Sequence, residues 1–286
     1  MSLAAAPART LVFCHANSFP AGTYSALFEA WRRAGWRVLA PDKLGHDPAY
    51  PVTNGWRHLR DELLAFIERE AVNPGHAPVV LVGHSMGGYV SLLAASRKPA
   101  WVNGVLLLDA PIVAGWRAPA FGLLKLSGLI HRGGPGKASA RRREQWPSLE
   151  AAHAHFAAKP MFARWAQGVL DDYLRHGLVP DAQGVPGSVT LAFEREIETR
   201  IYSTLPHHVP ALLRRHPLRC PVAFIAGKRS AENRQLGLDF VRRLAGPRWR
   251  WMEGSHLFPM ERPEETAAAA LALLAPLLTP SRPGPD

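Results

Sequence analysis

The pentapeptide Gly-His-Ser-Met-Gly at residues 83–87 places a serine between two glycines, directly after an apolar segment. The preceding segment 78–82 (Pro-Val-Val-Leu-Val) is typical of a buried strand, and the following segment 88–96 is typical of a helix. G-x-S-x-G between a strand and a helix is typical of a strained turn that exposes a serine hydroxyl, and glycines leave room for that turn. The pattern predicts Ser85 as a nucleophile that lies close to the N–H groups of the following helix.

A serine nucleophile needs a base within hydrogen-bond reach, and His256 is the candidate among thirteen histidines. It lies between a predicted strand at 248–253 and the last predicted helix, so its loop returns to the carboxyl edge of the sheet, where open α/β sheets bind ligands. The side chain of His84 is expected to point away from its neighbour Ser85 and to pack in the core. His207 and His208 have no cysteine or carboxylate partners at ligand spacing, so no metal site is predicted.

The elements that must position these residues follow a regular order. Continuous apolar segments suit strands that are buried on both faces, and helical segments separate them, which predicts an open, mostly parallel α/β sheet. The first four such segments are 10–16, 36–42, 78–84 and 102–111.

The alternation stops after Pro111, where glycine-rich turns separate amphipathic helical pieces and no strand is predicted. It resumes at residue 218 with a strand, a helix at 231–246, another strand and a closing helix. We therefore predict a core made of residues 1–111 and 218–286, and an α-helical cap made of residues 112–217.

Three motifs in this order resemble those of α/β-hydrolase-fold proteins: His-Ala-Asn-Ser-Phe-Pro at 15–20, Gly-His-Ser-Met-Gly-Gly at 83–88 and Gly-Ser-His-Leu-Phe-Pro-Met-Glu-Arg-Pro at 254–263. The resemblance covers nearly the whole chain. It implies a Ser–acid–His triad in that chain order, a central sheet flanked by helices, and no cofactor. Only about nine residues precede the first predicted strand, so we expect about six strands and no N-terminal antiparallel hairpin.

The acid of the triad has two candidates. Family members commonly carry an aspartate in the turn after the strand at 221–228, where this chain has Ser230 and Ala231, and the first carboxylate there is Glu232. Other members carry it at the end of the preceding strand, where this chain has Asp109. A carboxylate that ends an apolar strand is costly to bury without a partner. This favours Asp109, with Glu232 as the alternative, although Asp109 could instead only cap backbone N–H groups.

The resemblance also implies an oxyanion hole made of two backbone N–H groups. By position these belong to Met86 and to Asn17, in the loop after the first strand. Ala16 replaces the family glycine and an extra residue precedes Pro20, so the N–H of Ser18 is the alternative donor. His15 is expected to support this loop.

The composition of the chain argues against nucleic acid and membranes as binding partners. The net charge is +11, but the basic residues are scattered apart from 137–143, and no nucleic-acid motif accompanies them. A solvated basic surface that attracts acidic substrates is the better interpretation. No segment approaches the roughly 18 to 20 apolar residues of a membrane span, and no signal peptide is recognisable. With only two cysteines, we predict reduced thiols, a cytoplasmic location and no integral membrane association. The oligomeric state is not predicted.

These features predict a cofactor-free serine hydrolase that cleaves an ester, thioester or similar acyl bond of a small-to-medium apolar molecule. Phe19, Trp116, Phe121 and Leu257 are the predicted substrate contacts, in a pocket formed by aromatic residues of the cap. Two alternatives stay open: hydrolysis of a carbon–carbon bond in a diketone, and a non-catalytic ligand-binding protein of the same fold.

Overall fold

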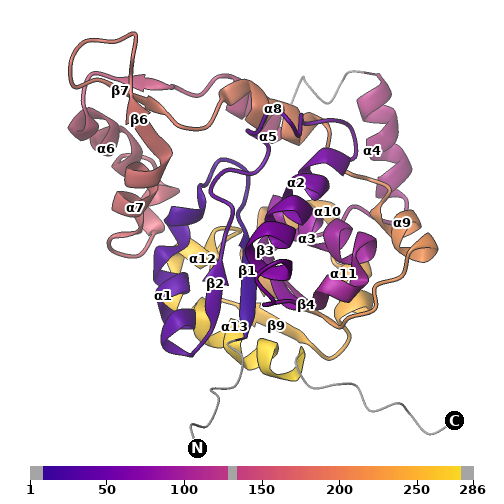
Figure 1. Ribbon diagram of the computed structural model, residues 1–286. Coiled ribbons are helices and arrows are strands. Elements are labelled where there is room, and N and C mark those ends of the chain that lie inside the picture. Colours follow the sequence, from indigo (N-terminus) through magenta and orange to yellow (C-terminus); the bar gives the residue numbers. More distant parts are fainter. Residues whose placement is uncertain (1–8, 128–133, 278–286) are drawn as a thin grey trace, which may run out of the picture.

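A six-stranded parallel sheet forms the centre of the molecule, with the strands in the order β2-β1-β3-β4-β8-β9 (Figure 1). The computed structural model describes residues 9–127 and 134–277. All neighbouring strands in this sheet pair in parallel, which confirms the predicted fold class. The strands are β1 (Thr10–Cys14), β2 (Arg37–Leu39), β3 (Val79–His84), β4 (Val102–Leu108), β8 (Val222–Gly227) and β9 (Trp249–Met252).

Helices cover both faces of the sheet, so that the core consists of two clusters (Figure 1). The alternation of side chains along β1 shows the division: Leu11 and Phe13 belong to one cluster, and Val12 and Cys14 to the other. The first cluster includes η1 (Ala21–Tyr24), α1 (Ser25–Arg33), α12 (Phe258–Glu261) and α13 (Pro263–Leu277). The second includes α2 (Arg57–Ile67) with η2 (Glu68–Val72), α3 (Met86–Arg97) and α11 (Asp239–Ala245). The turn η3 (Pro99–Trp101) leads into β4.

Between β4 and β8 the chain leaves the sheet, and residues 109–221 are called the excursion below. Its helices α5 and α8 pack against each other across one end of the sheet (Figure 1). The predicted helical composition is confirmed by α4 (Arg117–Leu126), α5 (Gly134–Ala140), α6 (Leu149–Ala157), η5 (Phe162–Arg164), α7 (Val169–Gly177), α8 (Arg195–Ser203) and α9 (Val209–Arg215).

Two local predictions are wrong. The excursion contains a small antiparallel sheet, β5-β7-β6, where no strand was expected (β5 Gln145–Trp146; β6 Leu178–Pro180; β7 Val189–Leu191). Its strands have only two or three residues, too few to show an alternating pattern. The single helix predicted at 231–246 is two helices, α10 (Ala231–Leu236) and α11, because Gly237 adopts φ 79° between them.

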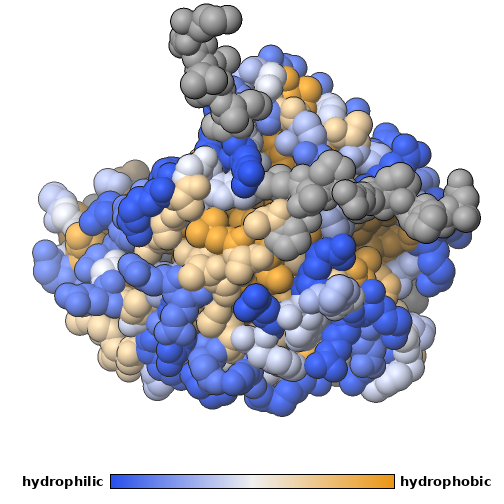
Figure 2. All heavy atoms as spheres, turned by 90° about the horizontal axis from the view of Figure 1, so that it is seen from below, coloured by the Kyte–Doolittle hydropathy of each residue, from blue (hydrophilic) through white to orange (hydrophobic). Residues whose placement is uncertain are grey.

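The surface carries both apolar and hydrophilic residues. On the face seen in Figure 2, apolar residues gather near the centre and hydrophilic residues surround them. Within the described residues, none of the helices has both the length and the hydropathy that crossing a membrane requires. Cys14 and Cys220 are free thiols.

Candidate active site

Ser85 lies in a tight turn between β3 and α3. Its backbone has φ 53° and ψ −115°, a conformation that is strained for a residue with a side chain. The flanking glycines explain how the turn fits: a Cβ on Gly83 would lie 2.4 Å from backbone atoms of Gly87, and a Cβ on Gly87 would lie 2.0 Å from the carbonyl oxygen of Cys14. Neither position tolerates a side chain without movement of the backbone.

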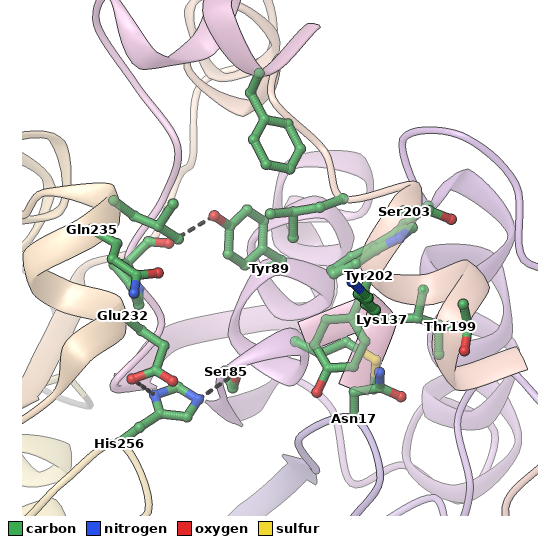
Figure 3. Close-up of a pocket in the computed structure, with 18 of the residues that line it drawn as sticks. Asn17, Ser85, Tyr89, Lys137, Thr199, Tyr202, Ser203, Glu232, Gln235 and His256 are labelled. Atoms are coloured by element: carbon green, nitrogen blue, oxygen red, sulfur yellow. Dashed lines mark hydrogen bonds and ion pairs between the residues drawn. The ribbon is translucent and has the colours of Figure 1, made fainter. Parts of the chain in front are cut away.

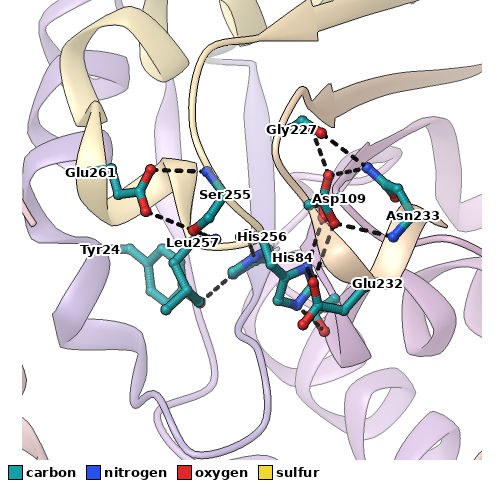
Figure 4. Close-up of polar contacts among 12 residues, drawn as sticks. Tyr24, His84, Asp109, Gly227, Glu232, Asn233, Ser255, His256, Leu257 and Glu261 are labelled. Carbon is teal, nitrogen blue, oxygen red and sulfur yellow. Dashed lines mark hydrogen bonds and ion pairs between the residues drawn. The ribbon is translucent and has the colours of Figure 1, made fainter. Parts of the chain in front are cut away.

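His256 lies within hydrogen-bond distance of Ser85. Its Nε2 is 2.9 Å from the serine Oγ (Figure 3), and its Nδ1 is 2.7 Å from Oδ2 of Asp109 (Figure 4). The loop between β9 and α12 carries the histidine. Glu261 holds this loop by accepting hydrogen bonds from the N–H and the hydroxyl of Ser255, at 2.9 and 2.6 Å. The structure thus brings together three side chains that are distant in sequence, at the carboxyl ends of β3, β4 and β9.

Asp109 is fully buried directly after β4, and its backbone has φ 44°. Its second oxygen, Oδ1, accepts hydrogen bonds from the N–H of Gly227 and from Nδ2 of Asn233, both at 2.6 Å (Figure 4). Three hydrogen-bonding nitrogens therefore contact this carboxylate: the N–H of Gly227, Nδ2 of Asn233 and Nδ1 of His256. Such partners offset the cost of burying the charge.

Glu232, the alternative acid, also faces the histidine. Its Oε2 lies 3.8 Å from Nδ1 of His256, beyond hydrogen-bond distance, and its side chain is 41% exposed. Ser230 caps the helix that carries Glu232, because its Oγ accepts a hydrogen bond from the N–H of Asn233. The serine at the usual family position thus orders the helix that places Asn233 on Asp109.

The two carboxylates set the protonation behaviour of His256. Burial acts to lower the pKa of the imidazole, but the hydrogen bond and charge of Asp109, together with the charge of Glu232, outweigh burial and raise the pKa above 6.5. The neutral imidazole remains available as a base at higher pH, and the imidazolium is stabilised when it forms.

The loop after β1 lies on the other side of Ser85 (Figure 3). Asn17 is 4% exposed, and its Nδ2 donates to the carbonyl oxygen of Glu198 in α8 at 3.1 Å. Met86 is the first residue of α3, and the first N–H groups of a helix have no acceptor within the helix. The backbone N–H groups of these two residues, with that of Ser18 (φ 74°) as alternative, stay the predicted oxyanion hole.

His84 packs in the core, and its hydrogen bonds connect both sides of the site. Its Nδ1 accepts from the hydroxyl of Tyr24 at 2.7 Å, and this hydroxyl also accepts from the N–H of Ala16 at 3.2 Å. Its Nε2–H then donates to the carbonyl of His256 at 2.9 Å. Burial, with a smaller effect of His256, holds the pKa of His84 well below 6.5, so it stays neutral. His15 supports the loop after β1 as predicted, because its imidazole bonds the carbonyl of Ala16 and the N–H of Leu44.

A cavity of about 730 Å³ opens above Ser85 and His256, between the sheet and the excursion (Figure 3). This volume lies within the range of sites for small molecules, about 300–1,000 Å³. Its apolar wall consists of Trp56, Met86, Tyr89, Ala110, Pro111, Phe121, Leu124, Ala140, Ile201, Leu205 and Leu236. Its polar lining comprises Asn17, Lys137, Arg141, Thr199, Tyr202, Ser203, Glu232 and Gln235.

Of the four predicted substrate contacts, only Phe121 lines this cavity. Trp116 is 72% exposed on the surface, and Leu257 is buried in the core cluster beside α12 and α13. Phe19 packs on Trp165 and Tyr173, with ring centroids 5.8 and 5.9 Å apart. The structure therefore places these three side chains outside the lining of the cavity: Trp116 faces solvent, and Leu257 and Phe19 pack in or against the core.

Most aromatic residues of the excursion lie outside the lining of this cavity. They form a continuous cluster that packs on the first core cluster. Its members are Trp146, Phe156, Phe162, Trp165 and Tyr173.

Sequence reasoning missed Glu198. This α8 residue is fully buried, and its carboxylate accepts hydrogen bonds from Arg142 at 3.0 Å and from Ser139 at 3.3 Å. Because its backbone carbonyl also holds Asn17, Glu198 links the excursion to the loop after β1. A glutamate in an amphipathic helix usually faces solvent, so its spacing carries no signal of burial.

Three possible metal ligands converge here among the described residues: Asp109, Glu232 and His256 offer atoms within 4.8 Å of one another. Both ring nitrogens of His256 already lie within hydrogen-bond distance of Asp109 and Ser85. A metal ion at Nδ1 would have to displace the Asp109 contact, so this donor set fits a hydrogen-bonded triad better than a metal centre.

Comparison with known proteins agrees with the fold. Residues 11–269 match the model of a family described as "Alpha/beta hydrolase family". Monoglyceride lipase of Rattus norvegicus is 30% identical over 110 residues, which are 37% of this chain and 36% of the rat protein. Phospholipase YtpA of Bacillus subtilis is 32% identical over 109 residues, 35% of this chain and 40% of the bacterial protein. The matched segments span well under half of these relatives.

Solved structures match over nearly the whole chain. E-2-(acetamidomethylene)succinate hydrolase superposes with a TM-score of 0.68 at 19% identity, covering 93% of this chain and 91% of that one. The thioesterase domain from the curacin biosynthetic pathway gives the same TM-score at 18% identity, covering 96% and 92%. At these identities the likeness concerns the fold.

Proposed function

Because the chain belongs to the alpha/beta hydrolase family, we propose that it hydrolyses carboxylic esters or thioesters through an acyl-enzyme on Ser85. The observation that carries the proposal is the continuous contact from Ser85 through His256 to the buried Asp109, at 2.9 and 2.7 Å. Relatives named monoglyceride lipase and phospholipase support an ester as the scissile bond.

In the first half of the proposed reaction, Oγ of Ser85 attacks the carbonyl carbon while Nε2 of His256 takes the hydroxyl proton. Asp109 holds the imidazole orientation and stabilises the imidazolium. The N–H groups of Met86 and Asn17 receive the developing oxyanion, where one such donor contributes about 2.7–4 kcal/mol. His256 then gives the proton to the leaving alkoxide or thiolate as the bond from it to the carbonyl carbon breaks.

In the second half, water attacks the acyl carbon of the serine ester, and His256 takes one proton of that water. The second tetrahedral intermediate collapses, the proton returns to Oγ of Ser85, and a carboxylic acid leaves. The chain supplies every acid, base and hydrogen-bond donor in this sequence of steps. We further propose that residues 112–217 act as the cap that shapes the cavity.

The test is hydrolysis of 4-nitrophenyl esters with acyl chains of two to twelve carbons. The wild type should turn over these esters, with the apolar wall favouring medium chains over acetate. Ser85→Ala should reduce kcat by about 10⁴-fold or more, as for other serine triads. Wild-type protein that is folded but hydrolyses none of the esters or the matching thioesters would overturn the proposal.

A further inference from the structure

Two cations of α5 and the residue after it line the cavity above Ser85. They are Lys137 and Arg141, four residues apart. The neighbouring basic residues are engaged elsewhere: Arg142 pairs with the buried Glu198, and Arg143 donates to the carbonyl of Gln145 at 2.7 Å. Within residues 9–127 and 134–277, neither Lys137 nor Arg141 forms an ion pair with a carboxylate. Two positive charges of this cavity are therefore uncompensated.

Lys137 and Arg141 are exposed at the end of α5, and an anion that binds between them would relieve the repulsion of two like charges four residues apart. The negative side chain of the cavity does not fill that role, because Glu232 faces His256. In Figure 3, Lys137 lies beside Tyr202 and Thr199, on the side of Ser85 opposite to Glu232 and His256. The cavity thus has a basic side and an acidic side, with the serine between them.

The basic side is also the more polar one. Lys137, Thr199, Tyr202 and Ser203 line it, and the fully enclosed Oδ1 of Asn17 has no hydrogen-bond partner there among the described residues. Tyr89, Phe121 and Leu124 belong to the apolar wall of the same cavity. A ligand that satisfies both parts has an apolar group and a charged, hydrogen-bonding group.

We infer that the substrate is an amphiphilic ester with an anionic group, a carboxylate or a phosphate, which binds between Lys137 and Arg141 while its apolar part fills the wall around Phe121. The inference rests on the proposed function and names its substrate class. The anionic group takes no part in bond cleavage. Its role is to orient the scissile carbonyl over Ser85, away from the carboxylate of Glu232.

Two pairs of esters test this inference and separate the two anions. In the first, mono-4-nitrophenyl adipate is compared with its methyl ester, which lacks the carboxylate. In the second, 1-lauroylglycerol 3-phosphate is compared with 1-lauroylglycerol, which lacks the phosphate. The wild type should prefer the anionic member of at least one pair by about tenfold in kcat/KM, since each exposed cation contributes only a modest attraction.

Lys137→Gln/Arg141→Gln should abolish that preference, because kcat/KM falls much more for the anionic ester of each pair than for its neutral partner. The matched control is Arg214→Gln/Arg215→Gln in α9, which removes the same two charges from an exposed helix end that does not line the cavity. It should keep the preference.

Other results would overturn the anion site alone or the proposed function with it. Equal rates for both members of both pairs overturn the anion site and leave ester hydrolysis intact. An equal loss of preference in both double variants overturns it as well, because general attraction by the net charge then explains the preference. Absence of hydrolysis of all four esters by folded wild type overturns the proposed function and this inference together.

Discussion

Asp109 and Glu232 both face Nδ1 of His256, but they differ in how firmly they are held. Asp109 is buried and receives two further hydrogen bonds at 2.6 Å, whereas the side chain of Glu232 is 41% exposed and 3.8 Å away. A fixed carboxylate selects the tautomer of the imidazole, and a mobile one contributes mainly charge. The two residues therefore have separable effects.

Replacing each acid by its amide measures this difference. Asp109→Asn should lower kcat by about 10³–10⁴-fold, because an amide there favours the wrong tautomer. Glu232→Gln should lower kcat by less than about tenfold, since it removes only a partly screened charge. Steady-state kinetics with a 4-nitrophenyl ester give both numbers. The reverse ranking would make Glu232 the acid.

The pH dependence follows from the raised pKa of His256. Only the neutral imidazole accepts a proton, so kcat/KM should fall as the pH drops through a midpoint above 6.5. Glu232→Gln should move this midpoint to lower pH, because the charge that favours the imidazolium is lost. An unchanged midpoint in Glu232→Gln would contradict this coupling.

The same raised pKa makes the stability of the fold depend on pH in the opposite direction. The contribution of the charged histidine to the free energy of unfolding is full below pH 6.5 and is lost as the pH rises through the pKa of the folded state.

At the scale of elements, one buried ion pair within the excursion holds Glu198, whose backbone carbonyl accepts a hydrogen bond from Asn17 in the loop after β1. Glu198 is fully buried, and Arg142 reaches it with a side chain that is only 19% exposed. Breaking such a pair on one side leaves an uncompensated charge, whereas removing both charges does not.

Arg142→Met should therefore lower the free energy of unfolding by roughly 3 kcal/mol, and Arg142→Met/Glu198→Leu should recover much of that loss. Arg195→Met is the control, because its pair with Glu144 is partly exposed and should contribute less than about 1 kcal/mol. Urea denaturation measures all three. A double variant that is no more stable than Arg142→Met would mean that the pair is not coupled.

Some of these elements could be predicted from the sequence, and others could not. The apolar strands and the glycines around Ser85 were recognisable because burial on both faces and a tight turn restrict residue type directly. Asp109 was recognisable because a carboxylate ending an apolar strand demands partners. The strands β5, β6 and β7 were not recognisable, because two or three residues are too few to show the alternation of apolar and polar side chains that is typical of a strand. Glu198 was also missed, because its helix looks amphipathic with a charged outer face.

At the scale of the whole molecule, the parallel sheet brings residues 85, 109 and 256 to one edge, as its strand order requires (Figure 1). Cavity contacts depend instead on how the excursion packs over that edge. Trp116 precedes α4 and Phe121 lies within it, five residues later, yet the first is exposed and the second lines the cavity. Composition alone does not distinguish them. The basic segment 137–143 was likewise predicted to be a solvated surface. In the structure, Lys137 and Arg141 line the cavity, Arg142 pairs with Glu198, and Arg143 donates to the carbonyl of Gln145.

In the proposed mechanism, His256 activates Ser85 as a nucleophile. The most direct measurement is intact-mass analysis after exposure to a fluorophosphonate probe, applied to the wild type, Ser85→Ala and His256→Ala. We predict one adduct on the wild type, none on Ser85→Ala, and labelling slowed by at least about 10²-fold in His256→Ala. A folded wild type without an adduct, or an adduct that persists in Ser85→Ala, would contradict activation of Ser85 by His256.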